Sequence, residues 1–486
     1  MFRFLAILLC AAVASPAADD LARQIKSLTD AYALLEENAA DPVNPEQAFY
    51  VGALPGLLKT LDPHSVFFDS GQFEQLREME SSTQKGFGSV VSLVPGRVVV
   101  LQTLPGTPSA KSGLMPGDEI MAINNYIIGR LDVDQLTELL GESRQHPAQL
   151  DVMRPGSGKI MRLTLVPEAM QSSSVERCFF LGPSIGYLHV TSFDENTGKD
   201  IKAAIDKLGG ASLANLILDL RANPGGVVTS ALETASLFLQ PGQIVFTIRG
   251  RNVPEKAEKV PDTAKPYPCK LVVLLDEKTA SASEIVSGAL QDHDRAMIVG
   301  EVSYGKGLVQ SVYPLSGGAG LALTTALYYT PSGRSIQKPL DAKRFELGAT
   351  TAHPNAKSEF HTDKGRLVTG GGGIRPDFVV EPEPLTRLHI ALMASGSFTT
   401  FATQYLRAHK VDQDWEVPPS AIDEFEAYVS AVGIQPGPAE WAGEGDYLRN
   451  HIKAEIFNQA FGVERGDQVE LQRDPLVLKA LEILGS

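Results

Sequence analysis

Residues 216–226 of this chain read Leu-Ile-Leu-Asp-Leu-Arg-Ala-Asn-Pro-Gly-Gly. The near-continuous apolar run at the start predicts a strand buried on both faces, and the proline and glycines predict a turn. A helical pattern follows over 229–239, and another strand and helix follow at 271–275 and 282–290. Because strand, turn and helix recur in this order, we expect an α/β core with a buried sheet over residues 169–385.

Different patterns lie on either side of this core. Residues 83–168 hold short strand-like runs separated by Pro-Gly turns, which predict a small β-rich domain. Residues 18–82 and 386–486 carry apolar positions at spacings of three and four, which predict helical regions. A chain of 486 residues is long enough for about three domains of this kind.

The composition excludes several classes of function. With 43 Lys and Arg against 58 Asp and Glu, the net charge is −15, so we expect no nucleic-acid partner, since phosphates require a basic surface. Neither the cysteines nor the nine histidines show the spacing of metal ligands, so we expect no metal and no cofactor. Cys178 and Cys269 could form a disulfide or remain buried thiols, and the sequence leaves both open.

The first residues predict export. A short positive start is followed by eleven apolar residues over 4–14 and by small residues around 15–17. This pattern is typical of a secretory signal peptide, here residues 1–17. Eleven residues are too few to span a bilayer, which needs about 20. We therefore expect a periplasmic or extracellular protein without a stable transmembrane anchor.

A serine stands where a buried strand joins a helix. Residues 278–285 read Lys-Thr-Ala-Ser-Ala-Ser-Glu-Ile. Ser281 and Glu284 fit a capping box, so one interpretation is purely structural. In the other, Ser281 is a nucleophile, because the helix N-terminus would stabilise an oxyanion formed on the carbonyl that it attacks. Ser283 is the alternative nucleophile.

A serine hydroxyl needs a base, and Lys306 lies 25 positions later between two glycines. Burial of its side chain would lower the pKa of the amine and make it a usable base, whereas a solvated loop lysine is the simpler alternative. Gln310 shares a face with Lys306 and could orient the amine without adding charge. The turn at Gly225 and Gly226 offers backbone N–H groups as oxyanion donors.

Together these segments resemble the C-terminal processing peptidases, also called tail-specific proteases. The resemblance covers about 80–385 and includes further matching stretches at 288–292, 323–337 and 373–377. Residues 86–88 and 113–120 resemble the corresponding loops of a PDZ domain. The resemblance implies a mixed-sheet, crossover-type core of the ClpP/crotonase-like kind. It also implies a PDZ domain inserted at 83–168, with helical regions at both ends.

The resemblance also implies roles for individual residues. Ser281 would be the nucleophile, Lys306 the general base and Gln310 the residue that orients the lysine. The oxyanion donors would be the backbone N–H groups of Gly225 and Ala282, with Gly226 as the alternative to Gly225.

The function implied is that of a serine endopeptidase acting on unstructured or C-terminal protein tails. Its PDZ domain would hold the tail by strand addition at Phe87, Gly88 and Ser89. Partners would be proteins or peptides with accessible C-termini, and the helical flanks could pair protomers in a homo-oligomer. The alternatives are a catalytically silent binding or scaffold protein on the same fold, and a Ser/His/Asp hydrolase using His293 and Asp294.

Overall fold

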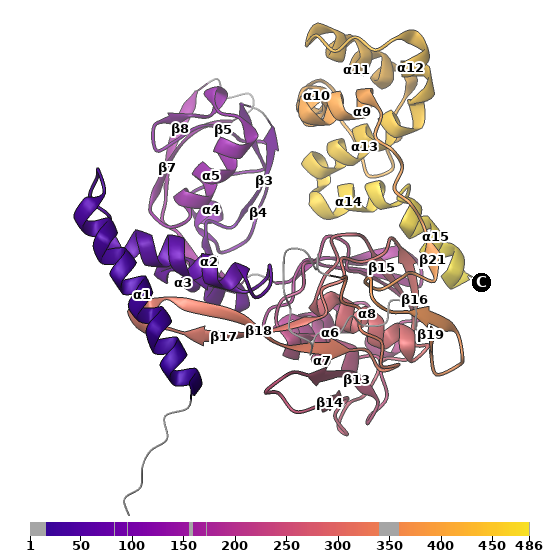
Figure 1. Ribbon diagram of the computed structural model, residues 1–486. Helices are drawn as coiled ribbons and strands as arrows, with labels where there is room; N and C mark the ends of the chain where they lie inside the picture. Colours follow the sequence, from indigo (N-terminus) through magenta and orange to yellow (C-terminus); the bar gives the residue numbers. More distant parts are fainter. Residues whose placement is uncertain are drawn as a thin grey trace, which may run out of the picture.

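The computed structural model describes residues 16–485 except for 82, 95, 155–158, 172 and 340–358. Figure 1 shows a central α/β part, a small β-rich part and a helical C-terminal part, with further helices at the N-terminal end. Most of the predicted signal peptide lies outside the described residues. Within the described part of the chain, no helix is both long and apolar enough to cross a membrane.

The centre of the molecule is a six-stranded mixed sheet. Its strands are, in spatial order, β10 (Val175–Gly182), β11 (Ile185–Val190), β12 (Asn215–Asp219), β15 (Lys270–Leu275), β16 (Met297–Gly300) and β21 (Phe378–Val379). β10 is antiparallel to β11, and the other neighbours are parallel. Parallel neighbours need crossover connections, which contain α6 (Thr197–Lys207), α7 (Val228–Ser236) and α8 (Ala282–Asp292). The predicted α/β class is therefore confirmed.

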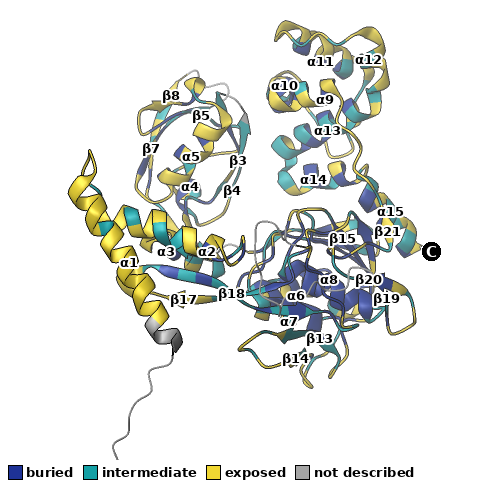
Figure 2. Ribbon diagram, viewed as in Figure 1, coloured by how far each residue is buried: buried dark blue, intermediate teal, exposed yellow. Residues whose placement is uncertain are grey.

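Both faces of this sheet are buried, as the continuous apolar runs predicted. Alternate strand residues point to opposite faces. Leu216 and Leu218 pack with α6, α7 and α8, whereas Ile217 packs on the other face with α15 (Pro475–Gly485). Figure 2 shows that buried residues concentrate in this central part. The sheet is thus a rigid base for the loops that leave its edges.

A second sheet attaches the N-terminal region to the core. It contains β1 (Val66–Phe68), β18 (Gly320–Tyr329), β13 (Ile244–Arg249), β14 (Lys256–Lys259) and β17 (Leu308–Pro314), which pairs with β18. The N-terminal helices are α1 (Pro16–Asn38), the π-helix η1 (Gln47–Ala53), α2 (Leu54–Lys59) and α3 (Ser70–Glu80). β1 lies between α2 and α3 and pairs antiparallel with β18. A strand therefore interrupts the region expected to be helical.

Residues 89–165, here called the β-domain, form a sheet with a separate core. Its elements are β3 (Ser89–Val94), β4 (Arg97–Thr103), α4 (Pro108–Lys111), β5 (Glu119–Ile123), β6 (Tyr126–Ile127), η2 (Ile128–Arg130), α5 (Val133–Ser143), β7 (Ala148–Met153) and β8 (Ile160–Leu165). Buried residues such as Val98, Leu136 and Leu150 fill that core. β2 (Thr83–Gly86) and β9 (Glu168–Gln171) pair as a separate ribbon, where the chain enters and leaves the β-domain.

The C-terminal helices pack around their own aromatic core. They are α9 (Arg387–Ala394), α10 (Ser397–Ala408), α11 (Pro419–Ala431), α12 (Pro438–Gly443), α13 (Gly445–Phe461) and α14 (Val463–Leu471). The rings of Phe401 and Phe425, for example, meet edge to face at 5.0 Å. The remaining short elements are η3 (Gly210–Ser212), η4 (Ser316–Gly318), β19 (Glu359–His361) and β20 (Leu367–Thr369).

The two later cysteines are free thiols. Cys269 is buried, and Cys178 is partly buried with its Sγ 3.7 Å from the carbonyl oxygen of Ala204. The sequence left open a disulfide or two free thiols, and the structure contains the free thiols.

Candidate active site

Three loops meet at one edge of the central sheet. β12, β15 and β16 are parallel neighbours, so the chain leaves all three at the same carboxyl edge. The loop after β12 carries Gly225, the loop after β15 carries Ser281 and the loop after β16 carries Lys306. Catalytic and binding residues of open α/β sheets commonly lie at this edge.

Ser281 occupies the residue before α8 in an unusual backbone conformation. Its φ is 56° and its ψ is −113°, and a positive φ is uncommon for a residue with a side chain. Such conformations cluster at functional sites and need support from the surrounding structure. Here the N–H of Ser281 donates to Glu284 Oε2 at 2.8 Å, which is one of the two bonds expected of a capping box.

Lys306 is partly buried and its amine is held by a neutral group. Its Nζ donates to Gln310 Oε1 at 2.8 Å, and Gln310 Nε2 in turn donates to the carbonyl oxygen of His64. Burial lowers the pKa of Lys306 below its usual value, and the charges of Asp62 and Glu284 oppose that shift. The structure therefore brings Lys306 and Gln310 together, and burial favours the uncharged form of the amine.

The Glu284 carboxylate connects the loops of Ser281 and Lys306. Its Oε2 accepts the N–H groups of both residues, at 2.8 Å and 2.9 Å. Its Oε1 accepts the Ser303 hydroxyl at 2.5 Å and the Gly305 N–H at 2.8 Å. Burial raises the pKa of Glu284, while these four donors stabilise the ionised form. The sequence suggested only the bond to Ser281.

Tyr328 makes a second connection between the same two loops. Its hydroxyl lies 3.0 Å from the carbonyl oxygen of Ser281 and also contacts the carbonyl oxygen of Lys306. The side chain is fully buried, and burial raises the pKa of its hydroxyl, which keeps the hydroxyl protonated as a donor. Tyr328 lies on β18, and only its match to the family resemblance drew attention to it.

The proline-glycine turn after β12 packs directly against the serine. Gly225 has a φ of 92°, and a Cβ built on it would lie 2.7 Å from Ser281 Cβ and 2.8 Å from the nitrogen of Ala282. A side chain would therefore clash here, so only glycine permits this close approach. The Gly225 N–H donates to Asn223 Oδ1 at 2.9 Å. Gly226 faces Phe193, with which it forms an isolated bridge.

Asn223 holds this turn in place through hydrogen bonds to other segments of the chain. Its side-chain Nδ2 donates to the carbonyl oxygen of Val190 at 2.8 Å. Its backbone carbonyl oxygen accepts the Ala280 N–H at 2.9 Å. The side chain is fully buried. Sequence reasoning noted this asparagine only as part of a motif, because its bonds are to residues far away along the chain.

The alternative side chains have other roles in this structure. Ser283 is fully buried, and its hydroxyl donates to the carbonyl oxygen of Asn223 at 3.3 Å. His293 lies at the far end of the 11-residue helix α8, about 16 Å along the axis from its start. Its ring contacts Asp363 Oδ2 at 2.7 Å and the carbonyl oxygen of Ile244 at 2.8 Å.

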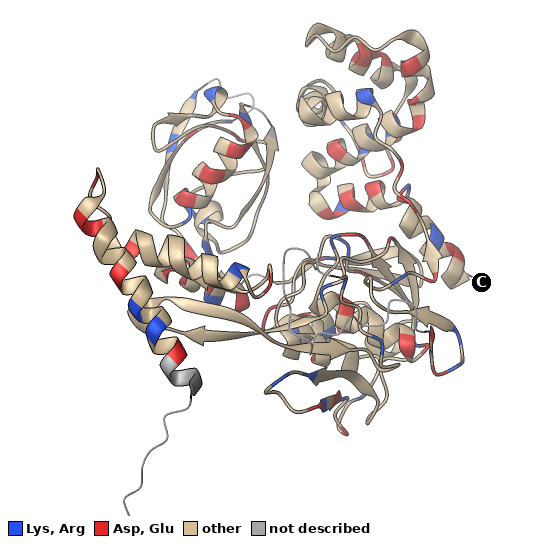
Figure 3. Ribbon diagram, viewed as in Figure 1, with Lys and Arg blue, Asp and Glu red and all other residues tan. Residues whose placement is uncertain are grey.

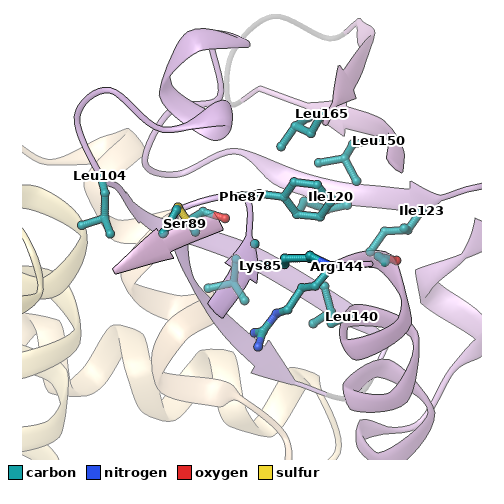
Figure 4. A pocket seen from close by; sticks show the side chains of 15 residues that line it. Lys85, Phe87, Ser89, Leu104, Ile120, Ile123, Leu140, Arg144, Leu150 and Leu165 are labelled. Atoms are coloured by element: carbon teal, nitrogen blue, oxygen red, sulfur yellow. The ribbon is translucent and has the colours of Figure 1, made fainter. Parts of the chain in front are cut away.

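A separate pocket lies where the β-domain joins the β2–β9 ribbon (Figure 4). Phe87, Gly88 and Ser89 line it, together with Lys85, Gly86, Val91, Leu104, Ile120, Ile123, Leu140, Ser143, Arg144, Leu150, Leu165 and Met170. Gly88 has a φ of 74°, and a Cβ there would lie 2.3 Å from Thr107. From these lining residues, the pocket lies between β3 and α5 and is mainly apolar. Lys85 and Arg144 contribute basic side chains to it.

Several known proteins resemble this chain. The model of peptidase family S41 matches residues 184–343. A carboxy-terminal-processing protease of Bartonella bacilliformis is 34% identical over 342 residues, which cover 66% of this chain and 78% of that protein. The carboxy-terminal processing protease CtpB of Bacillus subtilis is 31% identical over 337 residues, covering 68% and 69% respectively. A solved photosystem II D1 C-terminal processing protease covers 74% of this chain and 88% of that one, at 25% identity and a TM-score of 0.39.

The family model and the curated relatives place the chain among the serine peptidases, enzymes that act on protein substrates. It belongs to peptidase family S41, the carboxy-terminal-processing proteases. The resemblance inferred from its motifs is thereby confirmed.

Proposed function

We propose that the chain cleaves peptide bonds by Ser-Lys acyl transfer. Ser281 Oγ attacks the scissile carbonyl while the neutral amine of Lys306 takes its proton. The resulting ammonium returns the proton to the leaving amine, and water then hydrolyses the acyl-enzyme. The observation that carries the proposal is the amine of Lys306, partly buried and bonded to the neutral Gln310 Oε1 at 2.8 Å.

The surroundings of Ser281 support its assignment over Ser283. Ser281 is only partly buried and lies against Gly225, whereas the Ser283 hydroxyl is buried and bonded to the backbone. The N–H of Ala282 opens α8 beside the serine, where the helix N-terminus favours negative charge. We assign Ala282 and Gly225 as oxyanion donors, with Gly226 as the alternative. In the structure described here the Gly225 N–H is directed to Asn223, so the turn would have to release it.

The β-domain would serve as a PDZ domain inserted into a ClpP/crotonase-like core. Its pocket combines an apolar floor with the glycine-containing loop 86–88, and Lys85 and Arg144 add positive charge. These features suit an extended peptide whose terminal carboxylate binds the loop while its last side chain enters the pocket. The ligands would be unstructured protein tails with accessible C-termini.

We also propose that the protein is exported and forms a homo-oligomer. Export rests on the signal-like residues 1–17, which would place the mature chain in the periplasm or outside the cell. Oligomerisation rests on α1, whose leucine and isoleucine side chains are more than half exposed. An exposed apolar helix face of this kind is typical of an interaction surface.

The test is cleavage of an unfolded protein with an apolar C-terminus by the mature chain. Ser281→Ala and Lys306→Ala should abolish turnover, because each removes a group that takes part in the chemical step. Ser283→Ala is the matched control and should retain most of it. An inactive wild type, or undiminished cleavage by both Ser281→Ala and Lys306→Ala, would contradict the proposal.

A further inference from the structure

A turn in the N-terminal region lies beside the candidate site. It contains residues 62–65, Asp-Pro-His-Ser, between α2 and β1. Asp62 is buried, and its Oδ1 accepts the N–H groups of His64 and Ser65, both at 2.7 Å. Its Oδ2 accepts the Ser65 hydroxyl at 2.7 Å. An aspartate bonded to the backbone two residues later closes an Asx turn, which fixes the direction of the peptide groups that follow.

The turn is anchored to the sheet that carries Gln310. The Ser65 hydroxyl accepts the N–H of Thr324 at 3.2 Å, and Val66 pairs with Ala322 in the adjoining strands β1 and β18. β17, which carries Gln310, pairs with the other side of β18. The turn and Gln310 are therefore held on one framework.

The carbonyl of His64 determines which way the Gln310 amide faces. A carbonyl oxygen can only accept, so the bond from Gln310 Nε2 to His64 fixes the NH₂ end of the amide there. The opposite end, Oε1, then faces Lys306 Nζ at 2.8 Å. If the amide were rotated, its NH₂ group would donate to the lone pair that Lys306 needs for the proton of Ser281.

We propose that Asp62 is a positioning residue for Lys306. It closes the turn that aims the His64 carbonyl, the carbonyl orients the Gln310 amide, and the amide directs the amine. This inference rests on the proposed function, in which Lys306 is the base. It assigns to the N-terminal region a part in the peptidase site that the motifs of the core do not include.

Charges around the amine provide a second way to test Asp62. The carboxylates of Asp62 and Glu284 act on Lys306 and favour its ammonium form. Burial lowers the pKa of the neighbouring His64, and the charge of Lys306 lowers it further. Asp62→Asn keeps an oxygen for both backbone N–H groups but removes the negative charge. Without that charge the pKa of Lys306 should fall further. Asp62→Ala removes the charge and also opens the turn.

The experiment measures kcat and KM of the mature protein and of its variants as a function of pH. The range covers the acidic limb of the pH profile, where activity falls as the pH is lowered. Asp62→Ala should lower the plateau kcat by about 10- to 100-fold with little change in KM, because a misdirected base affects the chemical step. Asp62→Asn should keep kcat within about threefold and move the acidic limb to lower pH. Asp69→Ala removes the N-cap of α3 in the same region and should lower only stability.

A second measurement follows the amine without using catalysis. The rate at which an amine-specific reagent modifies Lys306, measured by mass spectrometry as a function of pH, reports the titration of that side chain. Asp62→Asn should shift this titration to lower pH. A wild-type plateau kcat in folded Asp62→Ala, together with an unshifted Lys306 titration in Asp62→Asn, would overturn the inference. Inactive wild type with the expected titration shift would instead refute the proposed function alone.

Discussion

Neutral and charged neighbours have different effects on the amine of Lys306. Gln310 bonds to it directly and carries no charge, whereas the carboxylates of Asp62 and Glu284 act on it through space. Burial disfavours the ammonium form, and the lowered pKa shows that burial outweighs both carboxylates. The site therefore depends on keeping the nearest partner of the amine uncharged.

A carboxylate at position 310 should move the pH dependence of the enzyme. Gln310→Glu would place a negative charge beside the ammonium and raise the pKa of Lys306, so the base would become neutral only at higher pH. The acidic limb of the kcat/KM profile should move to higher pH by about 1–3 pH units. Gln310→Met, which adds no charge, should lower kcat without an upward shift. An unmoved limb in Gln310→Glu would show that this amide does not control the base.

At this scale, sequence reasoning selected candidate residues whose chemistry shows in their local setting. Ser281 stood before a helix, and Lys306 stood between glycines with Gln310 four residues later. It missed the bonds of Glu284 to the lysine loop and the contact of Gln310 with His64, which is 246 positions away. Such contacts depend on tertiary pairing, which no local spacing encodes.

Among the elements, α15 covers the face of the central sheet opposite α6, α7 and α8. Leu476 and Val477 pack on the central sheet in one cluster with Ile217. Asp474, just before the helix, accepts the N–H groups of Leu476 and Val477 and also the guanidinium of Arg221 at 2.6 Å. α15 thus covers one face of the peptidase core, and Asp474 supports the segment leading to Gly225.

Two leucines of α15 allow a matched test of this packing. Leu476 is 7% exposed and Leu478 is 47% exposed, so substitution by alanine removes the same atoms from different surroundings. Leu476→Ala should cost about 2–5 kcal/mol of unfolding free energy, measured from the urea midpoint. Leu478→Ala should stay within about 0.5 kcal/mol. Equal losses would mean that α15 does not complete the core.

The sequence patterns predicted the elements of the core better than those at its margins. The apolar runs of β12 and β15 are long enough to specify buried strands, and both were expected. β1 has only three residues and becomes a strand because β18 offers it a partner, so the sequence pattern placed it within a region predicted to be helical. Likewise, the periodicity of α15 predicts a helix but not which sheet that helix covers.

At the scale of the molecule, α1 (Pro16–Asn38) stands out because its large apolar side chains are exposed. Figure 2 shows it exposed over its described length. Leu21, Ile25, Leu28, Tyr32 and Leu35 are spaced alternately by four and three residues, as along a coiled-coil seam. Tyr32 packs on Phe49 with ring centroids 5.1 Å apart, whereas the other four remain more than half exposed. Length and periodicity predicted this helix but could not show that, among the described residues, most of its apolar face would be exposed.

We expect a second copy of α1 to cover this seam. Figure 3 shows basic residues on α1 with acidic residues on either side, so ion pairs between two copies could offset part of the repulsion expected from its net negative charge. Leu28→Glu should convert an oligomeric mature protein to monomers, because a charge in an apolar seam cannot be buried without a partner. Leu34→Glu is the matched control, since Leu34 is exposed but lies off the seam. Light scattering after size exclusion gives the mass of each variant. A monomeric wild type, or an unchanged oligomeric mass in Leu28→Glu, would show that this face serves some other purpose.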